Sequence, residues 1–201
     1  MEDIAKLQIG ENSYEFPLVK GTENEVAIDV KTLRGATNGV ITIDPGYKNT
    51  GACLSAITFL DGEKGILRYR GYYIEELADK ADFLEVAFLL IFGELPSKEE
   101  LAKFHSDIKS ESIVDDDIRK ILDAFPKSAH PMGVLSSLTS ALTAFNPSND
   151  QINNIDYERS KTALYKNIVK VLGKIPVLVA WTLRKKQGLP LDYGDNSLGY
   201  V

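Results

Sequence analysis

The sequence predicts a mainly α-helical protein with a small β-rich part at its N-terminus. Short β-favouring runs separated by turn residues fill residues 1–43. A hairpin pattern follows over residues 56–69, with Asp-Gly between two apolar runs. From Tyr73 onward, apolar residues recur at helical spacing behind N-cap residues. We therefore expect a small β subdomain over residues 1–43 and a multi-helical domain over residues 44–201.

The expected strands are short, and turn residues bound each of them. The β-favouring runs of the first part are Leu7–Ile9, Tyr14–Val19, Val26–Val30 and Val40–Ile43. The turn signals between them are Gly10-Glu11-Asn12, Gly21 and Asn38-Gly39. In the hairpin that follows, Asp61-Gly62 supplies the positive φ that a tight turn needs between Ala56–Leu60 and Gly65–Tyr69.

Start and stop signals place three helices after the hairpin. Asp82–Glu85 has the spacing of a capping box, and Gly93 is suited to end that helix in a left-handed conformation. Ser97–Glu100 repeats the box and opens a polar helix through about Lys109. The acidic run Asp115–Asp117 then lies at the start of a third helix, where the macrodipole favours negative charge.

The C-terminal part contains the most apolar helices. One has an apolar stripe of Met132, Leu135, Leu138, Leu142 and Phe145, with small residues over much of its remaining surface. Another keeps the spacing of one buried face with Leu164, Ile168, Val171, Leu172 and Ile175. Val177–Leu183 is apolar almost all round, so we expect an enclosed helix that Gly188 and Pro190 end.

Composition excludes several classes of protein. A net charge of −6 and a pI near 5.0 argue against binding to nucleic acid, which requires a clustered basic excess. One cysteine and two histidines leave no Cys/His metal cluster, and we expect Cys53 to be a small buried side chain. We find no secretory signal and no membrane-length apolar run, and therefore expect a cytoplasmic protein.

A few charged residues are candidates for ligand contacts, each with a structural alternative. His130 precedes Pro131, where capping a turn is the simpler role, and His105 fits a solvated surface position. Lys166, Lys170 and Lys174 recur every four residues; the row is either an anion-binding stripe or a solvated face. Arg68 and Arg70 point the same way along a strand, toward a bound anion or toward Glu75 or Glu76.

Phosphate-loop and hydrolase motifs are missing from the sequence, and the residues assemble no catalytic constellation. The order of motifs nevertheless resembles the N-terminal half of a bacterial citrate synthase of the type that begins with a small β domain. The resemblance rests on Thr42–Gly46, Ser55–Gly62, Gly65–Leu67, Arg70-Gly71, Ile74, Leu77, Phe83–Val86, Leu90, Gly93–Pro96, His130–Met132 and Lys174–Pro176.

The resemblance implies a mostly helical homodimer or hexamer that joins acetyl-CoA to oxaloacetate and releases citrate and CoA, with no metal or other cofactor. It also implies that the catalytic aspartate, the two catalytic histidines and the substrate arginines lie beyond residue 201. His130 matches a His-Pro-Met motif that is not one of the catalytic histidines. We therefore assign no catalytic residue and expect this stretch to be an incomplete large domain, inactive alone.

The resemblance also bears on regulation, because some members are inhibited by NADH at a site away from the active centre. Lys170 and Lys174 are the candidate nucleotide-binding residues. Ser110-Glu111 stands where such members have Arg-His, and Asn146 stands where they have Tyr. Since an acidic residue is unfavourable beside a phosphate, we expect weak or absent NADH regulation.

Two alternatives to citrate synthase remain open. One is 2-methylcitrate synthase, which uses propionyl-CoA and differs in an acyl pocket that this stretch does not include. The other is a non-catalytic helical module that acts by self-association. In each case the apolar helices from Gly133 and Val177 require covering by other polypeptide, so we expect the 201-residue chain to associate.

Overall fold

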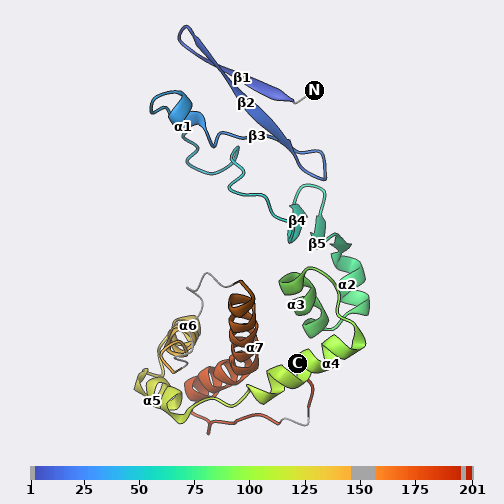
Figure 1. The fold of residues 1–201 in the computed structure, drawn as a ribbon. Helices are drawn as coiled ribbons and strands as arrows, with labels where there is room; N and C mark the ends of the chain where they lie inside the picture. Colours follow the sequence, from blue (N-terminus) through green and yellow to red (C-terminus); the bar gives the residue numbers. More distant parts are fainter. Residues whose placement is uncertain (1–2, 146–156, 196–197, 201) are drawn as a thin grey trace. The chain divides into compact units, whose positions relative to one another are not determined.

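The computed structural model describes residues 3–145, 157–195 and 198–200. The chain divides into two units, Met1–Ala56 and Ile57–Val201, which are taken separately below (Figure 1). Strands dominate the first unit and helices the second, so the mainly α fold class with a β-rich start is confirmed. The residues after 43, which we assigned to the helical domain, group with the strands up to Ala56.

The first unit is built on an antiparallel sheet with the strand order β1-β2-β3. Its strands are β1 (Ile4–Ile9), β2 (Asn12–Lys20) and β3 (Val26–Ile28). Leu7 pairs with Tyr14 and Leu18 with Ile28, and Gly10 provides the positive φ of 60° in the first turn. These three strands confirm the first three β-favouring runs of the sequence.

The fourth expected run and one side chain of this unit are placed differently from the prediction. A short helix, α1 (Leu33–Ala36), precedes Asn38-Gly39, and residues 40–43 form no strand. A β-favouring run needs a neighbouring strand to pair with, which local pattern cannot reveal. Cys53 is exposed in the irregular segment that follows, so its predicted burial is wrong.

The second unit begins with a small antiparallel sheet. Its strands, in the order β4-β5-β6, are β4 (Thr58–Asp61), β5 (Ile66–Tyr69) and β6 (Tyr72–Tyr73). Asp61 Oδ1 accepts hydrogen bonds from the backbone nitrogens of Glu63 and Lys64 at 3.1 and 3.0 Å, which fixes the turn. The predicted hairpin is therefore confirmed, but the positive φ of its turn belongs to Gly65, at 65°, and the prediction that Asp61-Gly62 supplies it is wrong.

Helices follow this sheet, and two of them, α3 and α4, begin and end where the capping signals predict. The first three are α2 (Ile74–Lys80), α3 (Phe83–Phe92) and α4 (Lys98–Ser110). Both capping boxes form: Glu85 donates its backbone N–H to Asp82, and Glu100 donates its own to Ser97. Gly93 closes α3 with a φ of 100°.

The remaining helices are α5 (Asp116–Ala124), α6 (Pro131–Ala141) and α7 (Tyr157–Gln187). They share a core in which α5 and α6 cover the C-terminal half of α7 (Figure 1). The buried residues of this core are Val114, Ile118, Leu122, Val134, Leu138, Leu142, Val177, Leu178 and Trp181. A second cluster joins Leu84, Phe104, Ile108 and Val169.

The buried faces of α6 and α7 differ from those that the sequence patterns predict. Met132 is 63% exposed, and Val134 occupies the core in its place. Val179 and Leu183 are 46% and 52% exposed, so α7 is enclosed on one side only by the described residues. In the N-terminal half of α7, Leu164 and Val171 are also exposed. The described residues therefore leave several apolar side chains of α7 exposed to solvent.

One long helix accounts for what the sequence presented as two apolar segments. α7 continues through Pro176, and Figure 1 shows a bend along its length. Proline removes one N–H from the helical ladder and crowds the preceding turn, which is a common cause of such bends. Gln187 is the last helical residue, and Gly188, with a φ of 73°, ends the helix as predicted.

Candidate functional site

The end of α4 and the middle of α7 approach each other more closely than any side chain larger than hydrogen would permit. A Cβ atom added to Gly173 would lie 2.6 Å from the carbonyl oxygen of Ile108 and 3.0 Å from that of Glu111. Such distances are well inside van der Waals contact. Glycine at position 173 is therefore what allows this crossing.

Lys174, next to that glycine, is tied to the end of α4. Its Nζ donates a hydrogen bond of 2.7 Å to the carbonyl oxygen of Glu111 and lies 3.3 Å from the Glu111 carboxylate. Only 9% of Lys174 is exposed. The ammonium thus compensates both a carboxylate and the negative end of the α4 macrodipole.

The lysine row on α7 does not present three equivalent cations. Lys166 is exposed, Lys170 is half-buried, and Lys174 is buried in its contact with Glu111. A row spaced by four residues drifts around the helix and meets different neighbours at each turn. Of the two expected nucleotide-binding residues, Lys170 is therefore partly accessible, and Lys174 is already paired with a carboxylate. Asn146, which stands where NADH-inhibited members have Tyr, lies outside the described residues.

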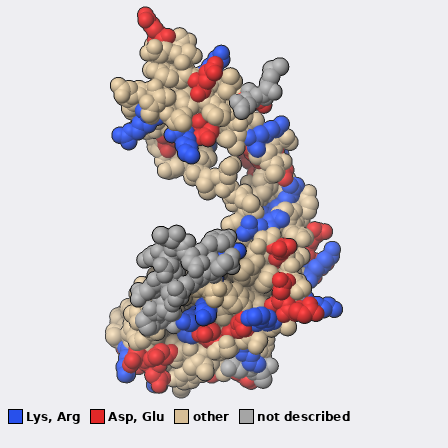
Figure 2. Space-filling view, viewed as in Figure 1, with Lys and Arg blue, Asp and Glu red and all other residues tan. Residues whose placement is uncertain are grey.

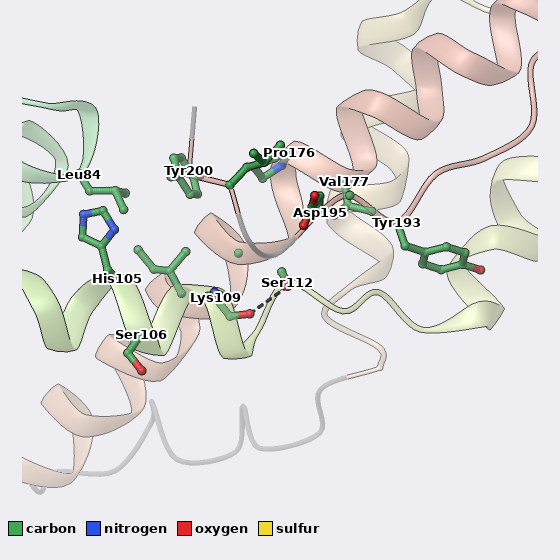
Figure 3. Close-up of a pocket in the computed structure, with 15 residues that line it drawn as sticks. Leu84, His105, Ser106, Lys109, Ser112, Pro176, Val177, Tyr193, Asp195 and Tyr200 are labelled. Carbon is green, nitrogen blue, oxygen red and sulfur yellow. Dashed lines mark hydrogen bonds between the residues drawn. The ribbon is translucent and has the colours of Figure 1, made fainter.

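A pocket of about 460 Å³ opens beside this crossing (Figure 3). Leu84, Ile108, Pro176 and Val177 supply apolar walls. Its polar lining side chains are His105, Ser106, Lys109, Ser112, Asp195 and the two tyrosines Tyr193 and Tyr200. Lys170 and Lys174 are not among the residues that line it. The chemistry of this pocket is that of a site for a small, partly polar molecule, with Lys109 as its cation.

Aromatic contacts hold the segment after α7 along one wall of this pocket. Trp181 Nε1 donates to the Asp192 carbonyl at 2.7 Å, and its ring meets Tyr193 edge-on with centroids 5.2 Å apart. Tyr200 stacks on Phe83 with centroids 5.4 Å apart. The Tyr200 hydroxyl donates to the Leu172 carbonyl at 2.8 Å.

A second polar link joins α4 and α7 away from the pocket. The Tyr165 hydroxyl donates a 2.6 Å hydrogen bond to Asp107 Oδ2, and Lys103 pairs with the same oxygen. Hydrogen bonds from Lys103 and then from Tyr165 hold the pKa of Asp107 below its ordinary value. Burial, followed by the hydrogen bond to Asp107, raises the pKa of the Tyr165 hydroxyl. Fifty-eight residues separate Tyr165 from Asp107, so no local sequence signal connects them.

The other charged candidates occupy structural positions. His130 is the N-cap of α6, where Nδ1 accepts the backbone N–H of Met132 at 3.2 Å, as the simpler expectation had it. His105 Nε2 lies 3.8 Å from a carboxylate oxygen of Asp82. The guanidinium of Arg68 lies 4.5 Å from the Tyr73 ring centroid, and Arg70 donates to the Leu90 carbonyl at 2.8 Å. Arg70 follows the end of β5 with a φ of 50°, so the prediction that both arginines point the same way along one strand is wrong.

The described part of the chain holds no cluster of three His, Cys, Asp or Glu side chains able to bind a metal ion. Among its helices, none combines the length and apolar character needed to cross a membrane. On the face shown in Figure 2, Lys and Arg side chains are interspersed with Asp and Glu.

Comparisons with known proteins give the class of this chain. The family model described as "Citrate synthase, C-terminal domain" matches residues 46–201. Citrate synthase 1 of Mycobacterium tuberculosis is 39% identical over 201 residues, which are 100% of this chain and 45% of that protein. The chain therefore belongs to the citrate synthase family, and it spans less than half the length of this relative.

Solved structures agree with this assignment. Citrate synthase from Pyrobaculum aerophilum superposes with a TM-score of 0.70 at 26% identity, covering 92% of this chain and 42% of that one. Citrate synthase from Thermoplasma acidophilum, solved as a ternary complex with carboxymethyl coenzyme A and oxaloacetate, shares the fold with a TM-score of 0.64 at 22% identity. That match covers 75% of this chain and 38% of the other.

Proposed function

We propose that the protein to which this sequence belongs is a citrate synthase, which condenses acetyl-CoA with oxaloacetate and water to give citrate and CoA. Membership of the family over residues 46–201 carries this proposal. Identity of 39% along the whole chain to a citrate synthase supports it. Of the two ligands in the Thermoplasma acidophilum structure, oxaloacetate is a proposed substrate, and carboxymethyl coenzyme A is a coenzyme A derivative, as acetyl-CoA is.

Within that reaction, we assign this stretch a supporting role. In the family, a carboxylate base, two histidines and arginines act on the substrates, and the resemblance places all of them beyond residue 201. The sequence has two histidines, of which His130 caps α6 and His105 lies beside Asp82. His130 matches a His-Pro-Met motif outside the catalytic set, and His105 has no counterpart among the catalytic residues that the resemblance implies. The 201 residues alone should therefore be inactive.

A thiol-release assay tests both parts of the proposal. The complete protein should release CoA from acetyl-CoA only when oxaloacetate is present, and the 201-residue chain should release none. A higher kcat/KM with propionyl-CoA would instead identify a 2-methylcitrate synthase. Ordinary turnover by the 201-residue chain would refute the supporting role, and no turnover by the complete protein would favour the non-catalytic module.

We further propose that NADH regulates this enzyme weakly or not at all. The buried contact between Lys174 and Glu111 supports this, because the cation is already neutralised by a carboxylate at 3.3 Å. A nucleotide phosphate would have to displace that carboxylate or lie beside it. Inhibition of the complete enzyme by micromolar NADH, measured in the same assay, would contradict the proposal.

Assembly and location belong to the same proposal. A homodimer or hexamer would cover the apolar side chains Val179 and Leu183, which the described residues leave exposed on α7. The proposed cytoplasmic location rests on the expectation drawn from the sequence. Sedimentation of the complete protein would give the subunit number, and a monomer would contradict the assembly.

A further inference from the structure

The Asn38-Gly39 pair connects no strands in this fold; it follows the short helix α1. We propose that Asn38 is a site of spontaneous deamidation. The backbone nitrogen of Gly39 loses its proton and bonds to the side-chain carbonyl carbon of Asn38, closing a cyclic imide. The side-chain nitrogen takes up a proton and leaves as ammonia. Water then opens the ring at either carbonyl, which yields aspartate or isoaspartate.

The surroundings of this pair leave the reacting atoms accessible. Asn38 and Gly39 are both exposed. A Cβ atom added to Gly39 would meet no other atom within 4 Å, so no neighbouring group crowds the Cα of this glycine. Within the described residues, the Asn38 side chain makes no hydrogen bond that would hold its amide away from the backbone. Glycine also lacks the side chain that would hinder attack by its own nitrogen.

One contact restrains the reaction in the folded protein. The Gly39 N–H donates a 2.9 Å hydrogen bond to the Arg34 carbonyl, so the attacking nitrogen is held by the end of α1. That helix has four residues, and its N-cap Thr32 makes no side-chain capping bond. Helices this short open easily, because few hydrogen bonds hold them. We therefore expect the reaction to proceed through local opening of α1, more slowly than in the denatured chain.

The other asparagines of the first unit provide internal controls. Each of them is followed by a residue with a side chain, and they are Asn12, Asn24 and Asn49. Asn24 has a φ of 70°, close to the 59° of Asn38, so the two differ chiefly in the residue that follows. If the following glycine decides reactivity, Asn38 converts first and Asn24 does not.

Peptide mapping by mass spectrometry tests the proposal. Trypsin releases residues 35–48, in which Asn38 is the only asparagine. After incubation of the purified protein in mildly alkaline buffer, this peptide should gain about 1 Da and split into aspartate and isoaspartate forms. Peptides carrying the other three asparagines should be unchanged over the same period. The gain should come faster in denaturant than in the native protein.

The matched variant is Asn38→Gly, which removes the reacting amide and tolerates the left-handed φ of 59°. Its peptide should show no mass gain, while the control peptides behave as before. An unchanged Asn38 peptide in both native and denatured protein would overturn the proposal. Earlier conversion at Asn12, Asn24 or Asn49 would overturn it equally.

Discussion

The ammonium of Lys174 lies where α4 ends and its last carbonyl groups lack helical partners. It donates to the Glu111 carbonyl and pairs with the Glu111 carboxylate, and only 9% of the residue is exposed. A charge in such a position is tolerated because it is paired and hydrogen-bonded. Removing the Lys174 ammonium would leave the Glu111 carbonyl and carboxylate without their donor, so this contact should contribute measurably to the free energy of unfolding.

Replacing Lys174 by Met should therefore lower the free energy of unfolding by about 1–3 kcal/mol, since a part-buried acceptor loses its donor. Denaturation by urea, monitored by far-UV circular dichroism, measures the change. The control is Lys166→Met on the same helix, where the exposed side chain should contribute within about 0.5 kcal/mol. Equal stability of the two variants would contradict a structural role for Lys174.

Asp107 gives the second prediction at this scale, because its pKa is depressed in the folded protein by Lys103 and Tyr165. A depressed pKa contributes stability that is present above the unfolded value near 3.9 and is lost as pH falls through the folded value. Asp107→Asn should lower stability at neutral pH and reduce the loss of stability in acid. Urea midpoints measured from neutral pH downward would show this; parallel curves for the two proteins would contradict it.

The crossing of α4 and α7 depends on a single glycine. Alanine is ordinarily the better helix former, by about 1 kcal/mol relative to glycine. At position 173, however, the added Cβ would lie 2.6 Å from the Ile108 carbonyl, so the two helices would have to separate. The contacts of Lys174 and of the core residue Val169 depend on the same crossing.

Gly173→Ala should therefore destabilise the protein, although alanine has the higher helix propensity. The matched control is Gly133→Ala in α6, where the new Cβ meets no atom within 4 Å. That change should be neutral or stabilising, by up to about 1 kcal/mol. Thermal unfolding of both variants measures the contrast, and a stabilised Gly173→Ala protein would show that α4 and α7 are free to separate.

At the scale of the whole molecule, α7 carries apolar side chains that the described residues do not cover. Leu164, Val171, Val179 and Leu183 are exposed along this helix. Several exposed apolar side chains on one helix are consistent with a surface that other polypeptide covers. It agrees with a chain that spans less than half the length of its citrate synthase relative.

The 201-residue chain should consequently self-associate, and the double substitution Val179→Glu with Leu183→Glu should shift it toward smaller species. Light scattering over a range of concentrations measures the effect. Leu60→Glu is the control, because Leu60 is exposed in β4, outside α7. A clean monomer of the unchanged chain at high concentration would refute this expectation.

Local signals in the sequence were sufficient for most helix and turn boundaries. The Asp82 and Ser97 capping boxes and the Asp61-Gly62 turn involve residues three or fewer positions apart, so their hydrogen bonds can be anticipated from spacing. Gly93 and Gly188 end helices for an equally local reason, which is their freedom to adopt positive φ. The order of such signals also carries the resemblance to citrate synthase.

Contacts between distant segments needed the tertiary structure. The sequence alone determined the mainly α fold class and the family, because both follow from short-range patterns in a particular order. Only the fold decided that Lys174 meets Glu111, 63 residues away, and that Tyr165 meets Asp107. The same holds for the exposure of Val179 and Cys53. Burial and pairing depend on which helix or strand packs alongside. Hydrophobic periodicity predicts which face of a helix is apolar, but it does not show which element covers that face.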